Sequence, residues 1–373
     1  MNLLFTGGGT GGHVYPALAI AECLRRKDPA SRVLFCGSAD GMEARLVPEA
    51  GVPFVGLAVR SPRSRSPIRA GVAAATAAAS IAQALPIVRR FRPAAIVATG
   101  GLAAIPVAAA GVARRVPVVV VEGNVLPGRV SRMLARWSRA VAVARAETAL
   151  DAGAGRVVVT GLPVRERIYS TPRAAGLAAF GLDGSRRTLL VIGGSQGAAR
   201  VNGAVEDATK RLARQQDLQV LHVAGGGWSA ARGGDERRQE GGVLYVRTSY
   251  VPHIELAYAC ADLVVSRCGA TSLAEIAAVG LPSILVPYRH AAEDHQAWNA
   301  KPLVAANAAV LVPDEALDGE SLAQAVASIL DRPGALDGMA ARARALGRRD
   351  AAERVLALIE RVARPETVAE AVP

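Results

Sequence analysis

Short apolar runs rich in β-branched residues alternate with longer alanine-rich segments along the whole chain. This rhythm is typical of a parallel sheet covered by helices, because strands buried on both faces are almost continuously hydrophobic. The predicted strands are residues 2–5, 32–36, 54–57, 95–98, 118–121, 140–143 and 157–159 in the first half, and residues 188–192, 218–223, 243–246, 263–265, 283–286 and 309–312 in the second. The pattern predicts an α/β protein with two doubly wound domains.

A domain boundary is predicted after Pro163, where a strand ends and a polar linker leads to the second half. A length of 373 residues suits two domains that each bury a core of their own. The predicted parts are a first domain at 1–163, a second at 164–345, an amphipathic last helix at 351–363 and a frayed tail at 364–373.

The net charge of +12 favours anionic partners. Aromatic residues make up only 4% of the chain and are not interleaved with basic stretches, which argues against nucleic-acid binding. The most basic loop, residues 60–69, holds four arginines and no acid. It is either a solvated loop or a contact to anionic lipid headgroups.

The four cysteines, Cys23, Cys36, Cys260 and Cys268, show no metal-binding or redox spacing and are expected to be small buried residues in a reducing cytosol. The first strand begins at once, so no signal peptide is expected. The alanine-rich segment 70–85 is too weakly apolar to span a bilayer. We therefore expect a soluble protein that at most lies against a membrane.

Two glycine-rich turns follow predicted strands, one in each half, at residues 7–13 and 193–197. A strand that turns through glycines into a helix directs backbone N–H groups and a helix dipole at one spot, which suits a phosphate. The first turn satisfies the dinucleotide-binding pattern, but the second strand ends Cys36-Gly37-Ser38 without the acid that would hold a ribose. The second turn lacks the lysine of a nucleoside-triphosphate loop, so ATP hydrolysis is not expected.

Several polar residues near predicted helix starts are candidates for chemistry. His13 adjoins the first glycine turn, where the helix dipole favours a neutral ring that can accept a proton; alternatively it caps backbone groups. Glu275 lies one turn into a predicted helix and could accept hydrogen bonds from vicinal sugar hydroxyls, or form a capping box with Ser272. His290 and His295 would not share a helical face, so polar contacts to a sugar fit this region better than a metal.

Five motifs, in this order, resemble the MurG family of peptidoglycan enzymes, which transfer N-acetylglucosamine from UDP-N-acetylglucosamine to lipid I and so make lipid II. They are Gly-Gly-Thr-Gly-Gly-His at 8–13, Gly-Leu-Pro-Val-Arg at 161–165, Gly-Gly-Ser-Gln-Gly at 193–197, Ser-Arg-Cys-Gly-Ala at 266–270 and His-Gln-x-x-Asn at 295–299. The resemblance implies a GT-B fold, in which two Rossmann-like domains face each other across a cleft. The C-terminal domain would bind the nucleotide sugar, the N-terminal domain the lipid-linked acceptor, and a final helix near 346–363 would pack back on the first domain.

The resemblance also implies roles for individual residues. Ser195 would hold the diphosphate, Val251 would pack near the uracil, Glu275 would bind the ribose and Gln296 would touch the sugar hydroxyls. The other implied donor contacts are Thr10, Gly11, Gly12, Asn124, Arg165, Ala270, Thr271, Ser272, Leu273 and Ala274.

We interpret the reaction as an inverting single displacement without a metal or other cofactor. His13 is the nominated base or diphosphate partner, and Glu122 is the second candidate base. The partners would be UDP-N-acetylglucosamine, lipid I and an anionic membrane surface. The protein would then be peripheral on the cytoplasmic face of the bacterial inner membrane, in a pathway that supports cell shape and division.

Two segments on the acceptor side depart from the family pattern: Glu122-Gly123-Asn124 stands where Glu-Gln-Asn is usual, and Leu102-Ala103-Ala104 where Tyr-Val-Ser is usual. Alternative interpretations are a GT-B enzyme with another lipid or small-molecule acceptor, and a dinucleotide-dependent oxidoreductase. The oxidoreductase would explain the first glycine turn but not the second.

Overall fold

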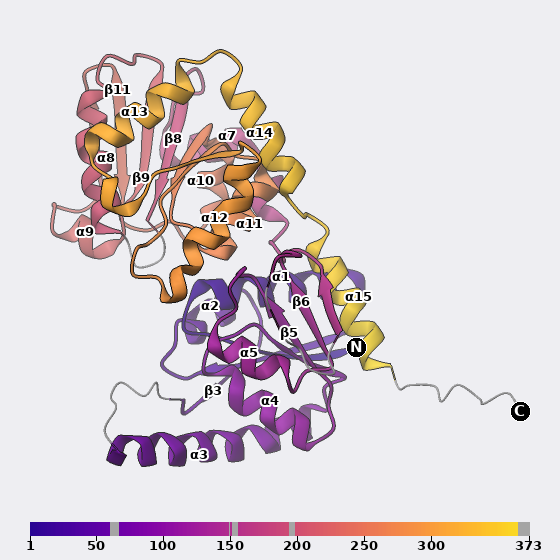
Figure 1. Cartoon of the computed structure of the whole chain (residues 1–373). Coiled ribbons are helices and arrows are strands. Elements are labelled where there is room, and N and C mark those ends of the chain that lie inside the picture. Colours follow the sequence, from indigo (N-terminus) through magenta and orange to yellow (C-terminus); the bar gives the residue numbers. More distant parts are fainter. Residues whose placement is uncertain (60–66, 149, 151–155, 194–197, 365–373) are drawn as a thin grey trace, which may run out of the picture. The chain divides into compact units, whose positions relative to one another are not determined.

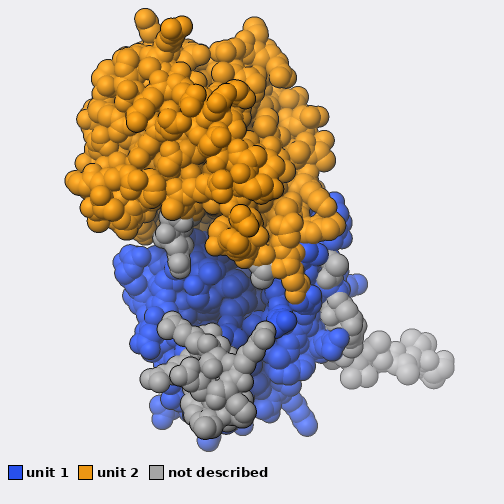
Figure 2. Space-filling view, turned by 60° about the vertical axis from the view of Figure 1, so that its left-hand side comes forward, with its two compact units in different colours: residues 1–163, 350–373 blue, residues 164–349 orange. Residues whose placement is uncertain are grey.

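The computed structural model describes residues 1–59, 67–148, 150, 156–193 and 198–364, and side chains within them except at residues 67–77 and 292. The chain divides into two compact units. Unit 1 comprises Met1–Pro163 with Asp350–Pro373, and unit 2 comprises Val164–Arg349 (Figure 2). Each unit is built around a seven-stranded sheet (Figure 1).

The unit 1 sheet is entirely parallel, with strand order β3-β2-β1-β4-β5-β6-β7. Its strands are β1 (Asn2–Thr6), β2 (Arg32–Ser38), β3 (Phe54–Leu57), β4 (Ala95–Ala98), β5 (Val118–Glu122), β6 (Ala140–Val143) and β7 (Arg156–Val159). Its helices are α1 (Gly11–Lys27), α2 (Glu43–Glu49), α3 (Pro67–Phe91), α4 (Ala104–Ala113), α5 (Arg129–Ala135) and α15 (Ala351–Ala363).

The last helix, α15, belongs to unit 1 although it follows unit 2 in the sequence. Its apolar stripe is buried, and it packs on α1. Two ion pairs join these helices, Arg26 to Glu353 and Lys27 to Glu360, each at 2.7 Å. Because both pairs are exposed, buried apolar surface contributes most of the attachment.

The unit 2 sheet has the order β10-β11-β9-β8-β12-β13-β14, parallel except for the edge strand β10. Its strands are β8 (Arg187–Ile192), β9 (Leu218–Val223), β10 (Glu236–Glu240), β11 (Val243–Thr248), β12 (Leu263–Ser266), β13 (Ser283–Leu285) and β14 (Ala309–Leu311). Its α-helices are α6 (Arg167–Ser170), α7 (Arg173–Phe180), α8 (Ala199–Arg211), α9 (Gly226–Ala230), α10 (Ile254–Cys260), α11 (Ala270–Val279), α12 (His295–Ala305), α13 (Gly319–Leu330) and α14 (Ala335–Leu346); Ala292–Asp294 and Asp314–Ala316 form 3₁₀ turns.

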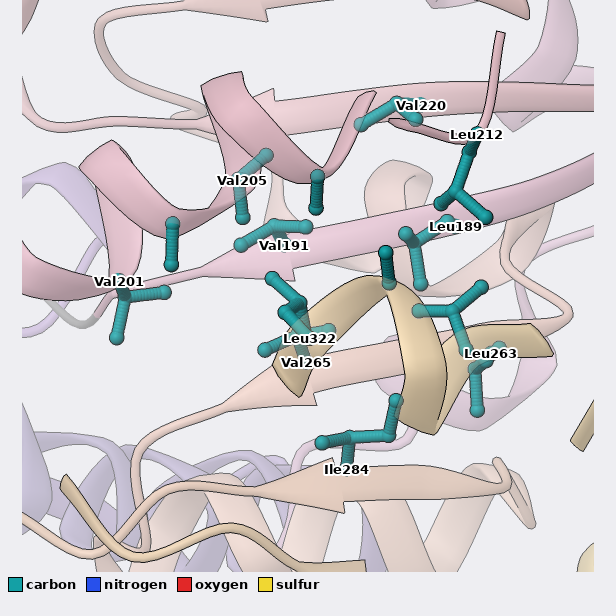
Figure 3. Close-up of a cluster of buried hydrophobic side chains, with 14 of the residues drawn as sticks. Leu189, Val191, Val201, Val205, Leu212, Val220, Leu263, Val265, Ile284 and Leu322 are labelled. Carbon is teal, nitrogen blue, oxygen red and sulfur yellow. The ribbon is translucent and has the colours of Figure 1, made fainter. Parts of the chain in front are cut away.

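Side chains of successive β8 residues enter cores on opposite faces of this sheet. Leu189 and Val191 pack with Val201 and Val205 of α8 and Leu322 of α13 (Figure 3). Leu190, on the other face, packs in the core that includes residues of α10 and α11. Both faces are therefore covered, as the continuous apolar strands predict.

The structure confirms the predicted α/β class and its two Rossmann-like sheets, each of which reverses its strand order once. The reversal lies between β1 and β4 in unit 1, and between β8 and β12 in unit 2. Ligands of such sheets bind beyond the carboxyl ends of the strands at this point. The loops of greatest interest are therefore those after β1, β4, β8 and β12.

Strand β10, of sequence Glu-Arg-Arg-Gln-Glu, is absent from the predicted strands because it has no apolar alternation. It forms a hairpin with β11 around Gly241 and Gly242. Arg238 pairs with both glutamates of its own strand and stacks on the Tyr245 ring, 4.1 Å from its centroid. Ion pairs within β10 and the stacking of Arg238 on Tyr245 of β11 thus stabilise an edge strand that sequence hydrophobicity does not reveal.

Candidate active site

In unit 1, the glycine turn after β1 makes hydrogen bonds within the protein. The Gly8 N–H donates to the Gly100 carbonyl at 3.2 Å, and the Gly9 N–H donates to Glu43 Oε2 at 3.0 Å. The other oxygen of Glu43 accepts from the Ser38 N–H at 2.8 Å. Two backbone N–H groups of the turn therefore donate to the protein itself, which corrects the expectation that this turn directs its N–H groups at a phosphate.

His13 lies in the first turn of α1 and is only partly exposed. Its Nδ1 is 2.7 Å from the Gly8 carbonyl oxygen and 3.4 Å from the Thr10 hydroxyl. A carbonyl oxygen can only accept, so Nδ1 carries a proton, and whenever the ring is neutral the lone pair is on Nε2. The imidazole of His13 contacts the Gly8 carbonyl, which precedes the helix, and caps no N–H group of α1. His13 is therefore not a helix cap.

Asn124 and the turn that contains Thr10, Gly11 and Gly12 follow strands of the unit 1 sheet. Glu122 is the buried last residue of β5, and its Oε1 accepts from the Asn124 N–H at 2.7 Å and from the Asn124 amide at 3.0 Å. These hydrogen bonds hold Asn124 in place. They also occupy Oε1 of Glu122, the second candidate base.

In unit 2, Ala270, Thr271, Ser272, Leu273, Ala274 and Glu275 form the first part of α11. This helix starts at Ala270 after Gly269, and none of the described side chains caps it. Ser272 therefore lies inside the helix, and the interpretation as a capping box with Glu275 is wrong. The amino end of α11 lies at the reversal point of the sheet, where backbone N–H groups suit an anionic or polar ligand.

Glu275 is buried, with 7% of its surface exposed. Its Oε2 accepts from the Tyr258 hydroxyl of α10 at 3.1 Å. Burial raises the pKa of Glu275 to about 7, while the positive charge of Arg165 and the Tyr258 hydrogen bond act in the opposite direction. Arg165 is itself buried, and Val251 packs in the same core as Tyr258 and Leu273.

Gln296 connects two loops at the carboxyl ends of β12 and β13. Its Oε1 accepts from the Cys268 N–H at 3.2 Å and from the Tyr288 N–H at 2.9 Å, and Asn299 donates to the Cys268 carbonyl. Arg267 makes a further link, because it donates to Val286 O and to Asp314 at 2.6 Å. Both Gln296 contacts use the carbonyl oxygen, which leaves its NH₂ group to donate to a ligand.

The structure groups the predicted residues within each unit. Unit 1 holds Thr10, Gly11, Gly12, His13, Glu122 and Asn124; unit 2 holds Arg165, Val251, Ala270 to Glu275 and Gln296. Ser195 lies outside the described residues. The sequence did not single out Glu43, Tyr258 or Arg267, although the glycines at positions 8, 37 and 41 all make room for Glu43.

Two other predictions concern metals and membranes. Within the described ranges, no group of three or more His, Cys, Asp or Glu side chains is arranged to hold a metal ion. In the same ranges, none of the helices combines the length and apolar character that crossing a bilayer requires. All four cysteines are buried, as predicted.

Family comparisons agree with this architecture. Residues 3–143 match the glycosyltransferase family 28 N-terminal domain, and residues 188–355 match the family 28 C-terminal domain. The crystal structure of Acinetobacter baumannii MurG superimposes with a TM-score of 0.74 at 25% identity, over 96% of this chain and 99% of that one.

Curated relatives that match this chain over nearly their whole length carry one enzyme name, UDP-N-acetylglucosamine–N-acetylmuramyl-(pentapeptide) pyrophosphoryl-undecaprenol N-acetylglucosamine transferase. The protein from Moorella thermoacetica is 40% identical over 96% of this chain and 98% of its own length. The protein from Desulfitobacterium hafniense (strain DSM 10664 / DCB-2) is 38% identical over 95% of this chain and 98% of its own. The chain is therefore a glycosyltransferase of family 28 and belongs to this family of N-acetylglucosamine transferases.

Proposed function

We propose that the chain transfers N-acetylglucosamine from UDP-N-acetylglucosamine to the 4-hydroxyl of N-acetylmuramic acid in lipid I, with inversion at the anomeric carbon. The assignment of the donor site rests on the buried Glu275, which lies near the reversal point of the unit 2 sheet. One of its oxygens accepts a hydrogen bond from the Tyr258 hydroxyl. Vicinal ribose hydroxyls can donate to the carboxylate oxygen that Tyr258 does not use.

The remaining donor contacts follow from this position. In our proposal Arg165 and the first residues of α11 lie beside the ribose and phosphates, Val251 borders the uracil, and Gln296 donates to sugar hydroxyls. Ser195 and the start of α8 would bind the diphosphate, where a helix N-terminus stabilises the charge that grows on the leaving group. Thr10, Gly11, Gly12 and Asn124 are proposed as donor contacts from unit 1.

His13 is proposed as the base of a single displacement. The acceptor oxygen forms a bond to the anomeric carbon while the bond to the β-phosphate oxygen breaks, and UDP leaves with that electron pair. The acceptor proton passes to Nε2, the ring nitrogen left unprotonated by the contact of Nδ1 with Gly8. Glu122 is the weaker candidate, because one of its oxygens already accepts two hydrogen bonds from Asn124.

We also propose a peripheral position on the cytoplasmic face of the inner membrane, in a pathway that serves cell shape and division. The basic segment 60–66 lies outside the described residues, as do the side chains of residues 67–77. Two large apolar side chains among the described residues of unit 1 are exposed next to arginines in the sequence. Val112 lies near Arg114 and Arg115, and Trp137 follows Arg136. Apolar residues flanked by arginines suit an anionic lipid surface, whereas the few aromatics argue against nucleic acid.

A thermal-shift experiment tests the donor assignment. A ligand at 100 times its dissociation constant stabilises the folded protein by about 2.7 kcal/mol. We expect UDP and UDP-N-acetylglucosamine to raise the melting temperature and NAD to leave it unchanged. Stabilisation by NAD but not by UDP would instead support a dinucleotide enzyme.

Liposome sedimentation tests the membrane proposal. We expect more protein to sediment with anionic vesicles than with neutral ones, and salt to reduce the difference. Equal binding to both kinds of vesicle would contradict the electrostatic part of the proposal.

A further inference from the structure

The buried Glu43 has no role in the chemistry described above, yet it contacts the turn that carries His13. Glu43 is the first residue of α2, and its side chain is completely buried. A Cβ atom added to Gly8, Gly37 or Gly41 would come within 2.5 Å of it. Three glycines thus make space for one carboxyl group of the protein itself.

Both oxygens of Glu43 accept backbone hydrogen bonds, Oε2 from Gly9 and Oε1 from Ser38. The Gly9 N–H belongs to the same peptide group as the Gly8 carbonyl. That carbonyl accepts from His13 Nδ1 at 2.7 Å. One planar peptide group therefore has Glu43 on its N–H side and the imidazole on its carbonyl side.

This arrangement controls which ring nitrogen of His13 is protonated. A carboxyl oxygen that accepts the Gly9 N–H fixes the peptide plane and polarises its carbonyl oxygen, since hydrogen bonds in a chain strengthen one another. The carbonyl then holds the proton on Nδ1 and leaves the lone pair on Nε2. Thr99 adds a second constraint, because its hydroxyl donates to the backbone carbonyl of His13.

We propose that Glu43 is a positioning residue for His13, acting through the Gly8–Gly9 peptide to keep the imidazole in the Nδ1-protonated form. The inference deepens the proposed function, because it assumes that His13 Nε2 accepts the acceptor's proton. It assigns Glu43 no contact with either substrate.

The test combines NMR with kinetics on the full-length protein. Long-range ¹H–¹⁵N spectra of histidine-labelled protein distinguish the two neutral imidazole forms, and the His13 signals are assigned by their absence from His13→Ala. We expect the Nδ1-protonated form in the parent protein. In Glu43→Gln the amide has one acceptor and one donor, so one of the two backbone N–H groups loses its partner. The His13 signals should then move toward the Nε2-protonated form, and kcat should fall at least about tenfold while the KM for UDP-N-acetylglucosamine stays within about twofold.

Glu49→Gln is the matched control, since Glu49 ends the same helix with 55% of its side chain exposed. It should leave both the His13 signals and kcat unchanged. Unchanged His13 signals in folded Glu43→Gln would overturn the inference. If that variant does not fold, the parent spectrum decides, because a predominantly Nε2-protonated His13 contradicts the proposed geometry. A full-activity His13→Ala would refute the base assignment instead, while the NMR result would still report on Glu43.

Discussion

Glu43 in unit 1 and Glu275 in unit 2 are both buried close to the reversal point of their sheet, and they differ in what their oxygens contact. Both oxygens of Glu43 in unit 1 accept backbone N–H groups. Glu275 in unit 2 accepts from one side chain, Tyr258, through one oxygen, and burial raises its pKa to about 7. A carboxyl saturated by the backbone shapes a loop, whereas one with an oxygen to spare can bind a ligand. We therefore expect Glu43 to influence the catalytic rate and Glu275 to influence the affinity for the donor.

The largest expected effect comes from His13, the residue that Glu43 positions. His13→Ala should lower kcat by about 10²- to 10⁴-fold, because a positioned base is lost. The dissociation constant for UDP, measured by calorimetry, should change little. Turnover within a few-fold of the parent would show that His13 is not the base.

Glu275→Ala, in unit 2, should weaken binding of the donor nucleotide. Loss of hydrogen bonds to a charged acceptor costs about 1.5–3 kcal/mol, so UDP should bind roughly 10- to 100-fold more weakly. The His13 NMR signals should stay in place. Glu320→Ala, at an exposed position of α13 in the same unit, is the control and should leave UDP affinity unchanged. Unaltered affinity in Glu275→Ala would remove Glu275 from the donor site.

The raised pKa of Glu275 predicts that donor affinity depends on pH. Ribose hydroxyls bind best to the ionised form, so UDP affinity should increase by roughly tenfold from pH 6 to pH 8. Glu275→Gln cannot ionise and should lose this part of the dependence. A pH profile identical to that of the parent would contradict the assignment.

The contribution of Glu275 to the free energy of unfolding should change with pH in the opposite direction to UDP affinity. The pKa of Glu275 in the folded state, about 7, exceeds its ordinary value of 4.5. Between these values the folded chain holds a proton that the unfolded chain has released, so the contribution of Glu275 to the free energy of unfolding falls as pH rises and is level above about pH 7. Denaturant titrations of the parent and Glu275→Gln would isolate this contribution, which should be absent from the variant.

The smallest effect is expected from Tyr258→Phe. Removing the hydroxyl takes away one hydrogen bond, worth about 1 kcal/mol, so UDP affinity should drop only a few-fold. Because that hydrogen bond lowers the pKa of Glu275, the midpoint of the pH dependence should move upward. A midpoint that moves downward would contradict this account of the pair.

Strand positions can be predicted from sequence wherever strands are buried on both faces. The run at 118–121 is apolar throughout and forms most of β5, whereas the charged β10 gives no such signal because its stability comes from the hairpin and from Arg238 over Tyr245. The start of α11 is harder to predict because Ser272 has the composition of a cap, yet the chain enters the helix at Gly269.

Candidate site residues are predictable where they lie in motifs with recognisable spacing. His13 and Gln296 belong to such motifs, and Glu275 closely follows the motif at 266–270. The Glu43 contact with Gly9 spans 34 positions in the sequence and the Tyr258 contact with Glu275 spans 17, and no local pattern encodes either of them. Only the structure reveals that the glycine turn of unit 1 encloses a carboxyl group of the protein.

Release of UDP in the presence of UDP-N-acetylglucosamine and a lipid I analogue tests the proposed transfer reaction itself. We expect UDP formation that requires the analogue, yields one disaccharide product per UDP and is strongly reduced in His13→Ala. UDP release that is independent of the analogue, or no release with a folded protein that binds UDP-N-acetylglucosamine, would contradict it.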